Sequence, residues 1–133
     1  MPRTFRLALS ASLLGLSGCA VSPAPQEVVE VEIATAARPD HGICHLAELR
    51  GTLVADREFG LVVGGHDPAV SPAVVVWPHG YRAGDVAGVR VLFDASGAIV
   101  ARVGDTISSA GGQSAAADER FHACGTVTVV PPP

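Results

Sequence analysis

Two imidazoles and a thiol lie within five residues of one another, at His41, Cys44 and His45. These residue types bind copper or zinc, which favour nitrogen and sulfur ligands. A metal site needs three or four ligands in a fixed geometry, and a cysteine that is oxidised cannot supply a thiolate. We therefore expect this cluster to be a solvated entrance to the domain, and we assign no metal ligand to it.

Three further histidines, His66 beside Asp67, His79 and His122, lie in expected loops and could gather at one end of a small domain. A histidine paired with an aspartate is also the material of general-base catalysis. The chain has no Gly-x-Ser-x-Gly motif, however, and no serine has the context of a nucleophile. We predict that the protein is not an enzyme and has no catalytic residue or cofactor. A metal-handling (copper or zinc) or hydrolytic role of the loop histidines is the alternative.

The only tryptophan and the only tyrosine of the chain lie in one short loop and are followed by an arginine. Two rings and a guanidinium could stack a sugar, a peptide or an apolar side chain of a partner. The candidate ligand-binding residues are Trp77, His79, Tyr81 and Arg82. The alternative, which the low aromatic content of 5% favours, is that Trp77 plugs the barrel end and Tyr81 holds the loop.

The first eighteen residues have the three parts of an export signal. Arg3 and Arg6 make the start basic, residues 7–16 are apolar or small, and two small residues precede Cys19. An apolar run of this length is too short to cross a bilayer, which takes about 20 residues. The tetrapeptide Leu16-Ser17-Gly18-Cys19 resembles the lipobox of bacterial lipoproteins.

This resemblance implies that residues 1–18 are a lipoprotein signal peptide and that Cys19 becomes the acylated first residue of the mature chain. Two or more acyl chains anchor a protein stably, because each buried methylene contributes about 0.8 kcal/mol. We therefore expect a lipid-anchored protein of the cell membrane or outer membrane, facing the periplasm or the cell exterior. By the same resemblance, Ala20 permits sorting to the outer membrane.

Lipidation of Cys19 leaves an even pair of cysteines, Cys44 and Cys124. In an oxidising compartment such a pair most simply forms a disulfide. This bridge would tie together the two ends of the folded part of the chain. For a loop of this size the chain-entropy model gives a stabilisation on the order of 4–5 kcal/mol.

The mature chain is acidic. Removal of residues 1–18 leaves seven arginines against thirteen aspartates and glutamates, which is a net charge of −6 with histidine neutral. The chain has no basic run of the kind that binds phosphates, so we expect no nucleic-acid partner. It also lacks lysine and asparagine, which excludes Schiff-base lysines, Walker-type phosphate loops and N-glycosylation sites.

Composition divides the mature chain into a tether, a domain and a tail. Residues 19–42 begin rich in proline and alanine and lack a broad hydrophobic pattern, so we predict a lipid-anchored flexible tether. Within this tether, residues 27–33 alternate and could form an edge strand. Residues 43–130 form one small β-barrel domain, and residues 131–133 are a proline tail.

The domain has the period-two alternation of β-strands. Val89–Phe93 and Ile99–Val103 flank Asp94–Gly97, which predicts a hairpin with a type I turn, a bulge and a left-handed Gly97. Gly104–Asp105 and Gly111–Gly112 are interpreted as turns, because no helix pattern follows them. Further strands are expected at 49–55, 59–63, 73–77 and 126–130, and at most a single helical turn at 114–120.

Five or six short strands predict an all-β fold, a small disulfide-closed barrel of the OB type. Two stretches, Trp77–Tyr81 and Val91–Asp105 with Gly111–Gly112 after it, resemble small bacterial lipoproteins and secreted proteins. The shared pattern is WP-x-GY, L-x-D-x-x-G-x-(I/V)-V-A-R-x-GD, GG and C. The resemblance covers roughly the second half of the chain, implies fold and location, and adds no catalytic residue.

Together these features predict a membrane-anchored lipoprotein of the cell envelope that acts as a non-enzymatic binding or structural module. Its expected partners are membrane lipid, through the acyl chains of Cys19, and an envelope protein or a glycan.

Overall fold

Nine β-strands, and no helix, make up the described part of the chain. The computed structural model describes residues 18–20, 24–39, 44, 47–113 and 119–133. The strands are β1 (Val28–Val31), β2 (Ala47–Asp56), β3 (Gly60–Gly64), β4 (Ala73–Val76), β5 (Arg82–Val86), β6 (Val89–Phe93), β7 (Ile99–Arg102), β8 (Thr106–Gln113) and β9 (Phe121–Val129). The predicted all-β class is therefore confirmed. The helical turn considered at 114–120 lies mostly outside the described residues.

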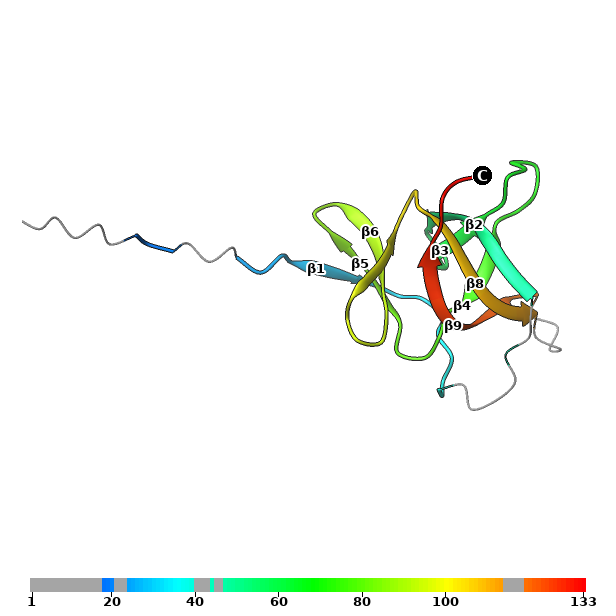
Figure 1. The fold of residues 1–133 in the computed structure, drawn as a ribbon, viewed down its shortest axis with the longest axis horizontal. Coiled ribbons are helices and arrows are strands. Elements are labelled where there is room, and N and C mark those ends of the chain that lie inside the picture. The colour runs from blue at the N-terminus through cyan, green and yellow to red at the C-terminus, as the bar shows by residue number, and fades with distance from the viewer. Residues whose placement is uncertain (1–17, 21–23, 40–43, 45–46, 114–118) are drawn as a thin grey trace, which may run out of the picture.

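Five of the strands close into a barrel in the order β2-β3-β4-β9-β8 (Figure 1). Neighbouring strands are antiparallel except β4 and β9, which run parallel. The last barrel strand thus lies between the third and the fourth, which is a Greek-key arrangement of the OB type. The predicted small OB-like barrel is confirmed.

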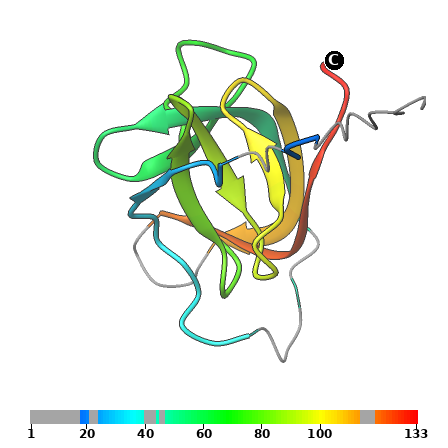
Figure 2. The same cartoon turned by 90° about the vertical axis from the view of Figure 1, so that its left-hand side faces the viewer.

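The other four strands form a second sheet in the order β1-β5-β6-β7. Strands β5, β6 and β7 are an antiparallel meander inserted between β4 and β8, and β1 pairs with β5. Figure 2 shows this sheet lying across one end of the barrel. The predicted total of five or six strands is too low. The sequence pattern predicts no strand at β5 or β8, and it indicates β1 only as a possible edge strand.

One hydrophobic core fills the barrel and continues into the meander. Inward-pointing side chains such as Leu53 of β2 and Ile107 of β8 are completely buried. From the meander, Leu92 packs into the same core and is paired with Ala83 on one side and Ala101 on the other. The two small alanines leave room for the sheet to lie close to the barrel around Leu92.

The connection between β6 and β7 is the hairpin predicted from the sequence. The Asp94 carboxylate accepts a hydrogen bond from the backbone N–H of Ser96 at 2.9 Å, and Gly97 has a φ of 87°. The backbone N–H of Gly97 donates to the carbonyl oxygen of Asp94 at 3.0 Å, which closes the turn, and a separate register shift lies further along the strand pair, between Leu92 and Phe93. Hydrogen bonds from the Ser96 side chain and from backbone N–H groups lower the pKa of Asp94.

Residues 28–36 are part of the folded domain, which corrects the prediction of a flexible tether over 19–42. They include β1 and continue to Thr35, which forms a parallel bridge to Trp77 at the end of β4. We call residues 28–36 the strap, because they run from the second sheet to the barrel. The alternative, an edge strand within residues 27–33, is confirmed by β1. Its partner β5 lies far downstream, so the local pattern could not reveal the pairing.

Gly60 lies where the strap crosses the barrel. Its φ is +73°, and a Cβ at this position would collide with the carbonyl oxygen of Glu32 and the side chain of Ile33. The Arg90 guanidinium adds a polar link, donating to the carbonyl oxygen of Gly60 at 3.2 Å and to Asp85 at 2.9 Å. The hydrogen bond from Arg90 lowers the pKa of Asp85. The strap, the meander and the barrel therefore meet at Gly60.

Gly111–Gly112 does not form the turn expected from the sequence but lies within β8. A Cβ on Gly111 would collide with the Phe121 ring and with the carbonyl oxygen of His122 on the neighbouring strand. The absence of a side chain therefore serves close packing between β8 and β9. By contrast, Gly104–Asp105 forms the expected turn, with a φ of 99° at the glycine.

Cys44 and Cys124 form the predicted disulfide, with their Cα atoms 5.8 Å apart. The bridge links the segment before β2 to β9 across a sequence separation of 80 residues. Because it closes most of the domain into one loop, it constrains the unfolded chain strongly.

We expect Gly60→Ala to lower the free energy of unfolding by about 2–4 kcal/mol, because the methyl group strains a positive-φ residue and also pushes against the strap. Gly97→Ala is the matched control. Gly97 has a φ of +87° with open space around it, so only the conformational strain of about 1–2 kcal/mol applies. Urea unfolding measures both losses, and equal losses would show that the strap does not press on Gly60.

Replacing Cys44 and Cys124 together by alanine should lower the free energy of unfolding by about 2–5 kcal/mol, because the unfolded chain regains the freedom that the long loop removes. Urea unfolding followed by the fluorescence of the buried tryptophan measures this loss. Cys19→Ala serves as the control, since Cys19 is exposed and outside the bridge. Equal stability of the double variant and the parent would contradict a stabilising bridge.

Candidate functional site

The aromatic rings predicted to contact a ligand are instead part of the core. Trp77 is 0% exposed, and Tyr81 is 8% exposed with its hydroxyl oxygen 3.4 Å from the backbone N–H of Val127, from which it accepts a hydrogen bond. The ligand role predicted for these two rings is therefore wrong, and the packing alternative holds. A chain with few aromatic residues uses its largest ones to fill the barrel.

His79 and Arg82, the other two candidates, are exposed but engaged with the strap. The Nδ1 atom of His79 lies 3.0 Å from the carbonyl oxygen of Ala36. The Arg82 guanidinium lies 3.3 Å from the Glu30 carboxylate and 5.7 Å from the centre of the Phe93 ring. These contacts hold residues 30 and 36 in place, so the aromatic loop is a support for the strap and is not the candidate site.

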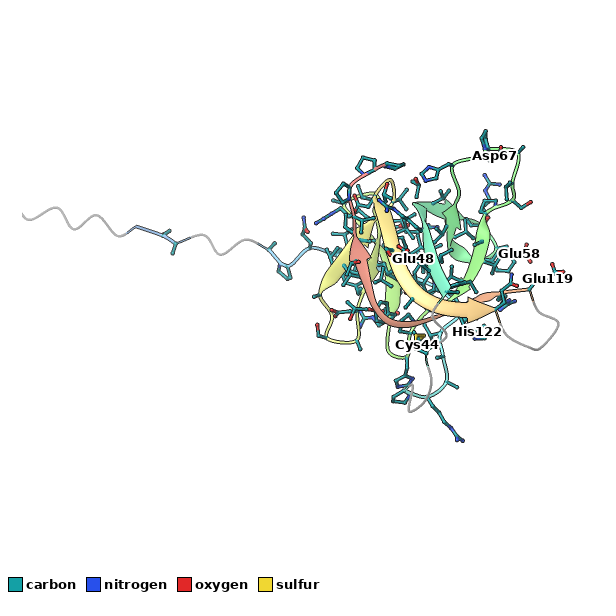
Figure 3. All side chains as sticks on the ribbon, turned by 45° about the vertical axis from the view of Figure 1, so that its right-hand side comes forward. Cys44, Glu48, Glu58, Asp67, Glu119 and His122 are labelled. Carbon is teal, nitrogen blue, oxygen red and sulfur yellow. A yellow bond between two sulfur atoms is a disulfide. The ribbon has the colours of Figure 1, made fainter. Side chains whose placement is uncertain are left out.

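A cleft of about 610 Å³ opens on the barrel between the β2–β3 turn, β4 and the start of β9. Strand β4 is short and shares two residue pairs with β3 and two with β9, so the barrel closes here over a brief contact. The cleft walls include two aromatic rings and four polar side chains: Phe59, Phe121, Ser71, Gln113, Glu119 and Arg120. Figure 3 shows Glu58 and Glu119 at this side of the barrel.

Phe59 is held at the cleft by the turn between β2 and β3. The Asp56 carboxylate accepts hydrogen bonds from the backbone N–H groups of Glu58 at 2.8 Å and Phe59 at 2.9 Å. The Phe59 N–H, followed by the Glu58 N–H, lowers the pKa of Asp56. The Arg120 guanidinium lies 5.7 Å from the centre of the Phe59 ring, within the range of a cation–π contact. The ring therefore stands in a defined place.

A second hollow, of about 300 Å³, lies against the same Phe59 and Arg120 pair. It is lined by the Glu32 and Glu58 carboxyl groups and by Ile33. Because Glu32 and Ile33 belong to the strap, the strap forms part of the wall. The phenyl ring and the guanidinium thus stand between a larger cleft and a smaller, more acidic hollow.

The sequence pattern alone did not indicate this site. Phe59 lies at the turn between the first two barrel strands, and Arg120 and Phe121 lie where the last barrel strand begins. In OB barrels, the loops between the first two and the last two strands bind ligands, and this positional rule could have found the cleft. Which loops meet is decided by barrel closure, however, and the aromatic loop at Trp77 had the stronger local signal.

The histidines of the alternative metal or hydrolytic role receive no support from the described residues. His66 is exposed and His122 is half-buried, whereas His41 and His45 lie outside the described residues. In the part of the chain that the structure describes, no group of three or more His, Cys, Asp or Glu residues could hold a metal ion. Cys44 is in the disulfide, so it supplies no thiolate.

Cys19, the predicted site of lipidation, has an exposed and free thiol. No described helix is long and apolar enough to cross a bilayer. Lipid attachment at Cys19 remains a prediction of the N-terminal sequence.

The free energy of unfolding should fall as the pH drops below about 4. The pKa values of Asp56, Asp85 and Asp94 in the folded protein lie below the ordinary value of 3.8. Depressed carboxyl groups contribute stability that is present above the unfolded-state pKa and is lost as the pH falls through the folded-state pKa. Urea unfolding between neutral and strongly acidic pH measures this slope. A variant with asparagine at all three positions should have a shallower slope, and an unchanged slope would contradict the assignment.

Comparison with known proteins returns no relative. No protein-family model matches the chain, and no curated protein and no solved structure matches it. The function is therefore inferred from the cleft residues, the charge and the N-terminal sequence.

Proposed function

We propose that this protein is a membrane-anchored, non-enzymatic binding module of the cell envelope, and that its cleft binds a glycan. The observation that carries this proposal is the position of the cleft. It lies on an OB-like barrel, between the β2–β3 turn and the start of β9. These are the loop positions at which OB barrels bind oligonucleotides and oligosaccharides.

The side chains of the cleft favour a sugar as the ligand. Phe59 and Phe121 offer apolar ring surface against which a pyranose can pack. Gln113, Glu119 and Arg120 supply hydrogen-bond donors and acceptors beside these rings. A sugar ring presents apolar C–H groups on its faces and hydroxyl groups at its edge, so both kinds of surface find partners in the cleft.

Net charge argues against an oligonucleotide in the same cleft. The mature chain carries −6, and three glutamates, Glu32, Glu58 and Glu119, line the cleft or the neighbouring hollow against one arginine, Arg120. Phosphate groups would be repelled by this field, whereas a neutral glycan would not. We therefore propose no nucleic-acid partner.

The absence of catalysis is also part of the proposal. None of the described residues that line the cleft is a histidine or a cysteine, so these residues supply no imidazole base and no thiolate. We assign the cleft to binding alone.

The anchor rests on the lipobox-like sequence. Cys19 follows an apolar run and two small residues, and it lies nine positions before the first residue of β1. Acyl chains on Cys19 would hold the barrel close to a membrane surface at the periplasmic or external face. Ala20 is compatible with the outer membrane as the destination.

The glycan proposal is tested by titrating the protein with neutral N-acetylglucosamine oligomers, followed by NMR of the backbone amides. We expect shifts at the amides of β4, the β2–β3 turn and the start of β9. Phe59→Ala should weaken binding about tenfold or more, because a stacked ring contributes about 1.4 kcal/mol or more at a binding hot spot. Ile99→Ala, an exposed apolar change on β7, is the matched control and should bind normally. Shifts at other surfaces, or none, would contradict the proposal.

The anchor is tested by Cys19→Ser in cells. This change removes the thiol that accepts the lipid, so we expect the protein to move from the membrane fraction to the soluble fraction. Cys44→Ser with Cys124→Ser is the control, because it removes two thiols without touching the lipobox. Retention of the Cys19→Ser protein on membranes would contradict lipid anchoring at Cys19.

A further inference from the structure

Exposed apolar side chains gather at one end of the second sheet, around the turn between β5 and β6. Val28 and Val29 of β1 are 37% and 57% exposed, Val89 of β6 is 45% exposed, and Val103 after β7 is 36% exposed. Ala87 in the turn is also exposed. We call these five residues the hairpin-end patch.

Strand pairing places the patch on both faces of the sheet at this end. Val28 pairs with Val86, which in turn pairs with Val89 across the β5–β6 hairpin, so Val28 and Val89 share one face. Val29 pairs with Asp85 and lies on the opposite face, because successive side chains of a strand alternate. The backbone N–H of Val103 donates to the carbonyl oxygen of Arg90, the partner of Asp85, at 3.0 Å. Apolar side chains therefore lie on both sides of the sheet at this end.

The β5–β6 turn places an apolar residue in an unfavourable backbone conformation. Ala87 and Gly88 both have positive φ, at 50° and 78°. A two-residue hairpin turn of this kind normally has Asn, Asp or Gly at its first position, because a Cβ disfavours the left-handed conformation. Ala87, at the first position of this turn, is exposed. Strain that persists at an exposed site points to a role for that site.

The ion pair beneath the patch is satisfied within the protein. Asp85 and Arg90 form two hydrogen bonds, at 2.9 and 3.2 Å. Two shallow hollows, of about 410 and 380 Å³, flank the turn and share Asp85 and Gly88. The charges of Asp85 and Arg90 thus neutralise each other, and the patch can contact an apolar surface without separating this pair.

The predicted anchor leaves the domain at this same end. Since Val28 pairs with Val86, β1 starts beside the β5–β6 turn. Figure 1 shows β1 and the β5–β6 hairpin on the same side of the molecule. Cys19 lies nine residues before Val28, and nine residues span at most about 30 Å. A lipid on Cys19 would therefore keep the hairpin-end patch close to the bilayer.

We propose that the hairpin-end patch inserts into the interfacial layer of the membrane that holds Cys19, so that the domain has a fixed orientation on the lipid surface. This inference rests on the lipid anchor of the proposed function. Binding at the boundary between headgroups and acyl chains strengthens with the apolar area that is buried there. Figure 3 shows Glu58 and Glu119, next to the cleft, on the side of the domain away from the N-terminal segment. The orientation thus turns the cleft toward the space beyond the membrane.

The test uses the full-length protein, which is expressed in cells, extracted from their membranes and reconstituted into vesicles. An environment-sensitive fluorophore is attached at the hairpin-end patch. Ala87→Cys introduces the labelled thiol, because Cys44 and Cys124 are bridged and Cys19 would carry lipid. Ala69→Cys, in the loop between β3 and β4, is the matched control. Nitroxide-labelled phosphatidylethanolamine, added to reconstituted vesicles of phosphatidylethanolamine and phosphatidylglycerol, serves as the quencher.

We expect quenching at position 87 to exceed that at position 69 by about twofold or more, with emission shifted to shorter wavelength, because apolar side chains at the interface lie within reach of the lipid label. Val89→Cys repeats the measurement in case Ala87→Cys does not fold. Adding Val29→Glu to the labelled protein should reduce the quenching while the protein stays in the membrane fraction.

The two proposals fail in different ways. Membrane-bound protein with equal quenching at positions 87 and 69 overturns the orientation and leaves the anchor intact. Protein that is found in the soluble fraction overturns the anchor, and the orientation with it.

Discussion

The architecture depends on the backbone hydrogen bonds between Trp77 and the strap. Its N–H donates to Ala34 at 2.8 Å and its carbonyl accepts from Ala36 at 2.9 Å, which fixes the strap beside the end of β4. The indole is fully buried, and its Nε1 atom finds no acceptor among the described residues. An unsatisfied donor costs about 1–3 kcal/mol, whereas burial of 150–250 Å² of ring surface contributes about 4–6 kcal/mol at 25 cal/mol per Å². Burial therefore outweighs the lost hydrogen bond.

The strap includes β1, an edge strand of the second sheet, so this contact joins the two sheets. The strap runs between two ends of the molecule. At one end, β1 begins beside the β5–β6 turn, where exposed valines lie. At another, the strap residues Glu32 and Ile33 help to line the hollow against Phe59 and Arg120. A single extended segment thus connects the proposed membrane contact with the proposed binding cleft.

Local features of the sequence predicted a substantial part of this fold. The hairpin at Asp94–Gly97 was predictable because a capping aspartate and a left-handed glycine act within a few residues. The disulfide followed from cysteine count. By contrast, the strap was assigned to a flexible tether, with an edge strand at 27–33 only as an alternative, because its partner is remote. Gly111–Gly112 was misinterpreted because the ring that requires a glycine there comes from the next barrel strand. The cleft was missed for the same reason, since Phe59 and Phe121 meet only through closure.

What the sequence by itself determined is the β class, the barrel type and the pairing of Cys44 with Cys124, whereas lipid attachment at Cys19 stays a prediction. These follow from residue identity, count and short-range periodicity. Only the tertiary structure decided that Trp77 and Tyr81 face inward and that Phe59 and Phe121 line a cleft. The physical reason is that an aromatic ring packs as favourably against a core as against a ligand, and its local sequence does not distinguish the two. Whether a ring lies in the core or in the cleft depends on the strand order, which is set by contacts between distant segments.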